Sequence, residues 1–408
     1  MGRAATVRRL LNILLWSVIA AAFIGPGTVT TCAQAGSDFG FALAWALLFS
    51  TVACIVLQEA AGRITVLTGH ELGTAIRQRY GGPAGINQVA TLLAAGVVLG
   101  CAAYQAGNLL GAVAGVRLVV DASPTLLTVV CGAGAAALLA TGSTRWIANI
   151  LGGLVAVMGV AFLVTAVRLA PDAGALLTGL LIPRIPSGST VLVLGLVGTT
   201  VVPYNLFLGS ALARGSRLGE MRWGLVLAVG GGGLISLGVL VVGTALGGGL
   251  AYERLGAVLG ARLGSGAEWS LAVGLFAAGF SSAITAPLAA AIAVRTLVGG
   301  AEGPQWSERS SRFRAVWLGV LLFGVGFGVA GVQPIPVIIL AQAFNGLLLP
   351  LVAVFLWLTM NDRRLLGDHG VNTFGQNLLM GVIVAACLAL GLRGLVAAAR
   401  NALALLGG

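Results

Sequence analysis

The chain reads Ile24-Gly25-Pro26-Gly27-Thr28 in the middle of its first apolar segment and Val202-Pro203-Tyr204 in the middle of its sixth. Proline has no backbone N–H to donate and its ring clashes with the preceding turn, so each stretch predicts a break in a helix. Inside a bilayer, non-helical backbone is tolerated only where protein or a water-filled cavity surrounds it. The two stretches therefore predict a pair of discontinuous membrane helices around a polar site.

The composition is that of a membrane protein. Of the 408 residues, 58% are hydrophobic and only 9% are charged, which is too little charge to cover the surface of a water-soluble domain. Apolar runs of about 20 residues, the length that crosses the hydrocarbon core of a bilayer, recur along nearly the whole chain. No segment between them is long enough for a separate soluble domain, so we predict a single transmembrane domain over residues 1–408.

The net charge of +11 comes from 23 basic residues, all of them arginines in short loops between apolar segments. Because they do not gather on one face, we predict the lipid bilayer as a partner and no nucleic acid. Most of them fall in loops that are cytoplasmic if the N-terminus is inside, and cytoplasmic loops carry the excess of positive charge in membrane proteins. We therefore predict a multi-pass protein of the cell (inner) membrane with a cytoplasmic N-terminus.

The hydrophobic pattern predicts about eleven membrane-spanning helices. They cover residues 7–34, 39–61, 89–116, 124–140, 146–169, 190–213, 223–248, 269–298, 315–332, 336–360 and 373–396. The interrupted helices are the first and the sixth, and such an offset inverts the second group of five relative to the first. An inverted five-plus-five repeat with broken first helices is a recurring plan of secondary transporters. The repeats are then residues 7–169 and 190–360, with residues 373–396 as an extra helix.

On these residues the chain resembles the NRAMP (natural resistance-associated macrophage protein) family of metal-ion transporters. Gly25-Pro26-Gly27-Thr28 stands where the family has Asp-Pro-Gly-Asn, and the run from Val202 to Ser210 stands where it has Met-Pro-His-Asn-Leu-Tyr-Leu-His-Ser. Gln342 precedes Pro350 by the spacing of the family's Gln and Leu-Pro. The resemblance implies an all-α membrane protein with a LeuT-type fold, broken helices 1 and 6, and the role of a divergent secondary transporter.

The departures from the family pattern bear on the cargo. The resemblance implies that the first-helix Asp and Asn and the sixth-helix Met hold a transition-metal ion, and here those positions are Gly25, Thr28 and Val202. A bare divalent ion in a low-dielectric site needs several ligands and compensating negative charge. Methionine is also the soft ligand that favours manganese or iron over magnesium or calcium. We therefore predict no metal site of the family's kind.

Proton coupling is affected in the same way. Acids of the third helix that the family uses for protons match Gln105 and Asn108, and the sixth-helix His positions match Tyr204 and Gly209. None of these side chains titrates at physiological pH as histidine does. We predict transport that is uncoupled or coupled differently from that of the family.

The predicted centre is a ring of neutral polar groups, together with helix N-termini that donate and unwound carbonyls that accept. Its candidate substrate-binding residues are Gly25, Thr28, Thr31, Tyr104, Gln105, Asn108, Thr199, Val202, Tyr204, Asn205, Gln342 and Asn345. Such a site suits a small polar, zwitterionic or anionic solute and not manganese or iron.

Several alternatives stay open from the sequence. The cargo could be a divalent cation, such as hydrated magnesium, held through carbonyl and hydroxyl oxygens, or the chain could be a non-transporting sensor or scaffold. The threonines could cap the half-helix, and Gln342 and Asn345 could form structural hydrogen bonds between helices. Ser281 and Ser282 are predicted to pack a helix contact, and Glu59 to pair with a loop arginine.

An enzyme is not predicted. The chain shows no nucleophile–base pair, and its two histidines, His70 and His369, fall in loops. No cofactor is expected, and the five cysteines lie within apolar runs without a disulfide or zinc spacing. The sequence specifies neither an oligomeric state nor a coupling ion.

Overall fold

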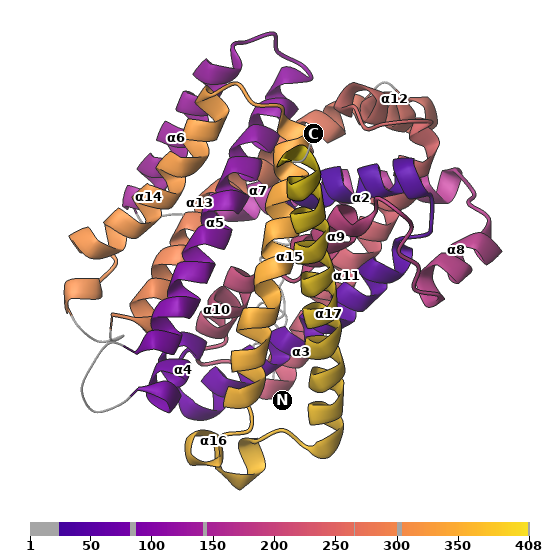
Figure 1. The fold of residues 1–408 in the computed structure, drawn as a ribbon. Helices are drawn as coiled ribbons and strands as arrows, with labels where there is room; N and C mark the ends of the chain where they lie inside the picture. Colours follow the sequence, from indigo (N-terminus) through magenta and orange to yellow (C-terminus); the bar gives the residue numbers. More distant parts are fainter. Residues whose placement is uncertain (1–23, 82–86, 142–144, 265, 300–303, 407–408) are drawn as a thin grey trace, which may run out of the picture.

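The computed structural model describes residues 24–81, 87–141, 145–264, 266–299 and 304–406. All regular elements in these residues are helices, and most of them run side by side as one bundle (Figure 1). Ten helices of this part of the chain are long and apolar enough to cross a membrane. The predicted all-α membrane fold is confirmed, while the first half of the predicted first helix, residues 7–23, lies outside the described residues.

The long helices follow the predicted spans to within a few residues. They are α3 (Ala44–Thr68), α5 (Gln88–Arg117), α6 (Pro124–Thr141), α7 (Arg145–Arg168), α11 (Leu218–Gly243), α13 (Ala267–Leu297), α14 (Ser311–Val329), α15 (Pro334–Thr359) and α17 (Phe374–Leu406). The largest difference is at the end of α17, which was predicted to end at residue 396 and continues to Leu406, and α3, predicted over 39–61, continues to Thr68 before Gly69. That glycine ends the helix because its φ of 73° is left-handed.

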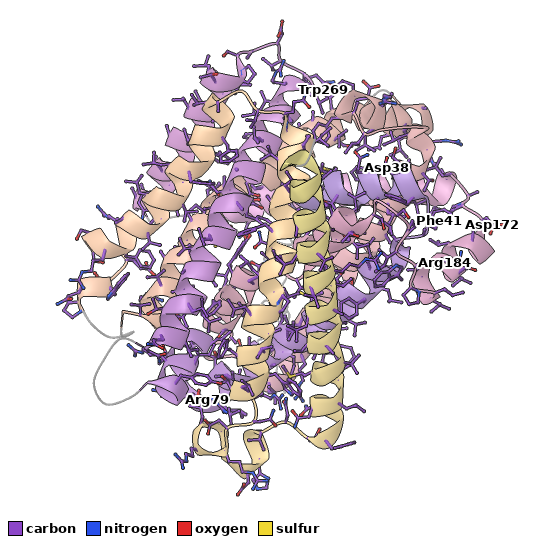
Figure 2. The ribbon with its side chains drawn as sticks, viewed as in Figure 1. Asp38, Phe41, Arg79, Asp172, Arg184 and Trp269 are labelled. Carbon is purple, nitrogen blue, oxygen red and sulfur yellow. The ribbon has the colours of Figure 1, made fainter. Side chains whose placement is uncertain are left out.

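Four short helices were not predicted, because each is too short to span a bilayer and lies in a connection. They are α4 (Leu72–Tyr80), α8 (Ala173–Leu181), α12 (Tyr252–Leu263) and α16 (Arg363–Gly370). In Figure 1, α4 and α16 lie at one end of the bundle and α12 at the other. Figure 2 shows Arg79 at the first end and Trp269 at the second. The first end is the one predicted to be cytoplasmic.

Both predicted breaks coincide with helix ends. The sixth segment consists of α9 (Thr190–Thr200) and α10 (Pro203–Leu212), with Val202 extended between them at φ −82° and ψ 123°. The helix α2 (Pro26–Phe39) begins at the first break, and Gly25 before it is extended. In both half-helices the proline occupies the first turn, where its missing N–H costs no helical hydrogen bond. Two half-helix N-termini are thereby placed in the interior.

Contacts that only glycine permits bring α9 against α15. A Cβ atom added to Gly198 would lie 2.0 Å from the carbonyl oxygen of Gln342, and one added to Gly346 would lie 2.3 Å from that of Leu194. Small residues at such crossings let membrane helices pack backbone to backbone. This contact sets Thr199, the next residue along α9, beside the stretch of α15 that carries Gln342.

Gly198→Ala tests this contact. We expect the variant to lose about 1–3 kcal/mol of unfolding free energy, because the new methyl group overpacks a backbone contact that cannot yield as a side chain would. Gly231→Ala in α11 is the matched control, since a Cβ there meets no atom within 4 Å. Unfolding in mild detergent measures both. Equal stabilities for the two variants would contradict the close approach of α9 and α15.

Candidate functional site

The two breaks meet through a pair of threonines. The Oγ1 atoms of Thr28, in the first turn of α2, and of Thr199, in the last turn of α9, lie 3.0 Å apart, within hydrogen-bonding distance. Both residues are buried. The structure thus brings together two candidate residues that are 171 positions apart in the chain.

Gln342 and Tyr104 complete this centre from two further helices. A Cβ atom on Gly27 would lie 2.0 Å from Nε2 of Gln342, so the glutamine amide lies directly over the start of α2. Tyr104 of α5 lies beside the side chains of Thr199 and Gln342. Its ring meets that of Tyr204 edge to face, with centroids 5.6 Å apart. Five helical segments, α2, α5, α9, α10 and α15, therefore converge on the breaks.

Several buried polar atoms of the candidate residues have no hydrogen-bond partner among the described residues. They are Oγ1 of Thr31, both amide atoms of Asn205, Oε1 of Gln342, Oδ1 of Asn345, Oε1 of Gln105 and Nδ2 of Asn108. Buried polar groups in proteins are otherwise almost always paired. Most of these atoms are amide or hydroxyl oxygens, so the region is rich in acceptors.

Gln105, Asn108 and Asn345 also have structural roles. Gln105 Nε2 donates to the carbonyl of Ala283 at 3.0 Å, and Asn345 Nδ2 donates to that of Gly100 at 3.2 Å. Both bonds join neighbouring helices, which agrees with the interhelical alternative predicted for Asn345. Asn108 lies on the face of α5 where its carbonyl approaches α13 closely. The role of these three residues in binding stays a prediction.

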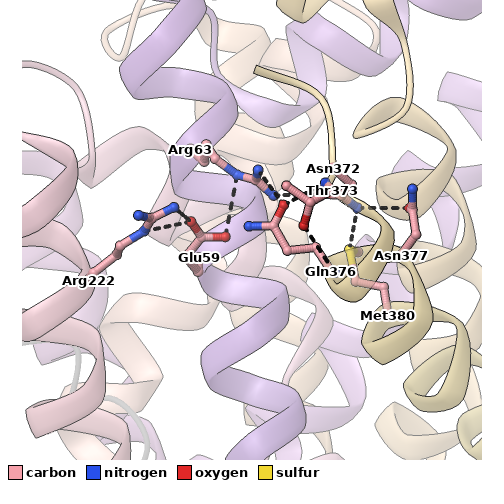
Figure 3. A network of polar contacts seen from close by, with 8 residues as sticks. All are labelled: Glu59, Arg63, Arg222, Asn372, Thr373, Gln376, Asn377 and Met380. Carbon is pink, nitrogen blue, oxygen red and sulfur yellow. Dashed lines mark hydrogen bonds and ion pairs between the residues drawn. The ribbon is translucent and has the colours of Figure 1, made fainter. Parts of the chain in front are cut away.

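None of the candidate residues is a carboxylate, and the ion pairs of Glu59 and Glu71 lie at the predicted cytoplasmic end. The described residues contain no group of three or more His, Cys, Asp or Glu side chains that could hold a metal ion. Glu59 pairs with Arg222 at 2.7 Å and with Arg63 at 3.4 Å, so the predicted ion pair forms. Its partners lie in helices α11 and α3 and not in a loop as predicted, because α11 begins at Leu218, earlier than the predicted residue 223. Arg63 further donates to Asn372 and Gln376, so one network joins α3, α11 and the start of α17 (Figure 3).

A second network closes the same end near α10. Glu71 binds Arg214 at 3.0 Å and approaches Arg295 of α13 at 3.8 Å. The Ser210 hydroxyl accepts from the backbone N–H of Leu72 at 2.7 Å, at the start of α4. The C-terminal end of the broken helix is therefore fastened to α4 and, through Glu71, to α13.

The opposite end is closed over α2 by the short helix α12. The hydroxyls of Tyr252 and Thr30 lie 2.6 Å apart, and Thr30 donates to the carbonyl of Pro26 one turn earlier. The second of these bonds is the backward threonine bond that the sequence left open as an alternative. Burial raises the pKa of Tyr252, so this phenol stays neutral and keeps its proton for hydrogen bonding.

One side chain at the centre was missed by the sequence analysis. A Cβ atom on Gly25 would lie 3.6 Å from Oγ of Ser282, so this serine of α13 faces the first break. We had assigned Ser282 to helix packing. No local pattern distinguishes it from Ser281, because the approach of α13 to Gly25 depends on the tertiary arrangement alone.

Comparisons with known proteins agree on one family. The model described as natural resistance-associated macrophage protein-like matches residues 17–397. A divalent metal cation transporter MntH of Klebsiella pneumoniae is 25% identical over 389 residues, which cover 91% of each chain. The manganese transporter of Eremococcus coleocola superposes with a TM-score of 0.75 at 19% identity, covering 97% of this chain and 88% of that one.

A more distant structure has the same fold. Mhp1 in an inward-facing conformation superposes with a TM-score of 0.58 at 15% identity, covering 96% of this chain and 90% of its own. Agreement over nearly the full length of both chains, with these low identities, concerns the fold alone. It confirms the LeuT-type fold that the family resemblance implied.

Glu59→Gln tests the network at the predicted cytoplasmic end. The side chain of Arg63 is only 6% exposed, so removing the carboxylate leaves a buried guanidinium with amide partners only. We expect the unfolding free energy in detergent to fall by about 1–3 kcal/mol. Asp368→Asn is the control, because its pair with Arg363 is 79% and 81% exposed and such pairs contribute less than about 1 kcal/mol. Equal losses would contradict this assignment.

Proposed function

The chain belongs to the natural resistance-associated macrophage protein family of secondary transporters, and we propose that its cargo is a divalent cation that keeps most of its water shell. The MntH protein of Klebsiella pneumoniae is named a divalent metal cation transporter, and the Eremococcus coleocola protein a manganese transporter. The family consists of transporters and not of enzymes. The open question is how this chain, with its altered centre, binds such an ion.

The observation that carries the proposal is the set of unpaired amide oxygens close to the breaks. Oε1 of Gln342 and Oδ1 of Asn205 are buried without partners in the described part of the chain, and the hydroxyls of Thr28 and Thr199 lie at the same two breaks. Water bound to a divalent ion is a strong hydrogen-bond donor, so a hydrated ion needs acceptors around it rather than direct ligands. Magnesium in particular sheds its waters reluctantly and usually keeps several of them in protein sites.

The missing side chains support the same proposal. Gly25 and Val202 offer no side-chain ligand, and no carboxylate stands among the candidate residues to offset the charge of a bare ion. Stripping a divalent ion of water in such a site is strongly unfavourable. A wide, neutral site that accepts the ion with its waters avoids that cost, and it also removes the preference for manganese and iron that a thioether ligand provides.

A second candidate cargo is a small polar, zwitterionic or anionic solute. The observation that favours it is that neither half-helix N-terminus, at Gly25 or at Val202, has a side-chain cap. Uncapped N–H groups and the helix dipole attract carboxylates and other anions. A zwitterion would place its carboxylate there and its ammonium group against the amide oxygens of Gln342 and Asn205.

Flux into proteoliposomes separates the two candidates. We expect magnesium to enter vesicles that contain the protein, measured with an enclosed magnesium-sensitive fluorophore, at a rate above empty vesicles. Entry should be nearly independent of pH between about 5.5 and 8, because the candidate residues include no histidine or carboxylate that titrates there. Entry of labelled small amino acids without magnesium would support the second candidate. Transport of neither cargo would favour the non-transporting alternative.

Restoring the family's side chains tests the assignment of the centre. We expect the triple variant Gly25→Asp, Thr28→Asn and Val202→Met to bind manganese at least about tenfold more tightly than the unmodified chain, since it regains a charged ligand and a soft one. Space for the first change exists, because a Cβ atom at position 25 makes only ordinary contacts. Calorimetry with manganese measures the change. Unaltered manganese binding by a folded variant would show that these positions do not line the site.

A further inference from the structure

We propose that Ser282 of α13 is a specificity-determining residue that contacts the cargo. It lies across the first break from Gly25 and supplies a polar group where Gly25 has no side chain. This inference rests on the proposed function of the centre as a binding site for a small polar cargo. It adds a helix, α13, that none of the predicted site residues occupies.

The geometry around Gly25 is the first argument. A Cβ atom built on this glycine would have two neighbours within 4 Å, Oγ of Ser282 at 3.6 Å and the backbone nitrogen of Gly27 at 3.9 Å. The nitrogen belongs to the first turn of α2, where the N–H of Thr28 already donates to the carbonyl of Gly25 at 3.0 Å, while the N–H of Gly27 precedes the first residue that can bond within the helix. The space that a side chain at position 25 would enter is therefore bordered by a hydroxyl and a backbone donor.

The second argument is that Ser282 is buried and unpaired. It is only 3% exposed, and its hydroxyl forms no hydrogen bond with any residue in the described part of the chain. Its neighbours on α13 behave differently, since Ser281 donates to the carbonyl of Ala278 at 3.1 Å and Thr285 to that of Ser281 at 2.8 Å. Serine in a membrane helix usually bonds backward in this manner. A hydroxyl that does not is available to a ligand.

The third argument is that α13 holds Ser282 in a fixed position. One turn earlier, a Cβ atom on Gly279 would lie 2.5 Å from the backbone nitrogen of Ala112 in α5, and one on Gly115 would lie 2.5 Å from the nitrogen of Phe276. The two helices thus meet backbone to backbone just before Ser282, and Gln105 of α5 donates to the carbonyl of Ala283 just after it. Binding groups on rigid elements are positioned more accurately than those on loops.

The chemistry of a hydroxyl fits either candidate cargo. It accepts a hydrogen bond from a water bound to a cation or from an ammonium group, and it donates one to a carboxylate. A carboxylate side chain at position 25, as in the family pattern, would occupy the space that Ser282 faces. Loss of that side chain leaves room for a larger cargo, such as an ion with its waters, to reach α13.

Ser282→Ala tests the inference in proteoliposomes, with magnesium as the probe. We expect the KM for magnesium entry to rise about tenfold, the equivalent of one hydrogen bond of about 1.4 kcal/mol, with little change in the maximal rate. Ser282→Thr retains the hydroxyl and should stay close to the unmodified chain. Ser281→Ala is the matched control and should change the KM by less than about twofold, since the hydroxyl of Ser281 is bound within its own helix. Equal values of KM for Ser282→Ala and Ser281→Ala would overturn the inference.

A second measurement does not depend on the cargo. Ser282→Cys and Ser281→Cys are treated with a small water-soluble methanethiosulfonate, with the unmodified chain and its five buried cysteines as the blank. We expect the cysteine at position 282 to react at least about tenfold faster, because thiolates react only where water and reagent reach them. Equal rates overturn the inference even if magnesium is carried. Faster labelling at 282 without magnesium entry supports the inference and refutes the proposed cargo.

Discussion

Backbone hydrogen bonding in the membrane interior is the constraint on which the rest of this structure depends. A proline in a membrane helix frees carbonyl groups that lipid cannot satisfy, so a break persists only where protein groups or a polar cavity surround it. Here the breaks at Gly25-Pro26 and Val202-Pro203 face one another, and the threonine pair Thr28 and Thr199 joins them. Neither helix alone could satisfy the backbone groups at its break. Together the two breaks line one polar centre.

Close helix packing positions the polar side chains around this centre. Glycines at the crossing of α9 with α15 and of α5 with α13 let backbones approach to contact distance, and the polar side chains next to those glycines are thereby directed inward. Gln342 lies over Gly27 for this reason. The same contacts that hold the bundle together therefore determine which amides and hydroxyls surround the breaks.

Charge is separated from the centre. The ion pairs of Glu59 and Glu71 lie at the predicted cytoplasmic end, where the first joins α3 to α11 and the second joins the residue before α4 to α13 and to the segment after α10. The carboxylates are stable there because water and neighbouring guanidinium groups solvate and pair with them. The interior retains neutral donors and acceptors, and this distinguishes the chain from a family pattern that supplies an acid and a thioether at the same positions.

The sequence by itself determined the membrane-spanning segments, the two breaks, the family and the side chains that are missing at Gly25 and Val202, because hydrophobic run length, proline and residue identity are local properties. The tertiary structure decided which polar groups meet. It extended α3 past the buried Arg63, added α4, α8, α12 and α16 to the connections, paired Thr30 with Tyr252 and set Ser282 opposite Gly25. These features depend on the crossing of helices that are distant in the chain, and no local pattern contains that information.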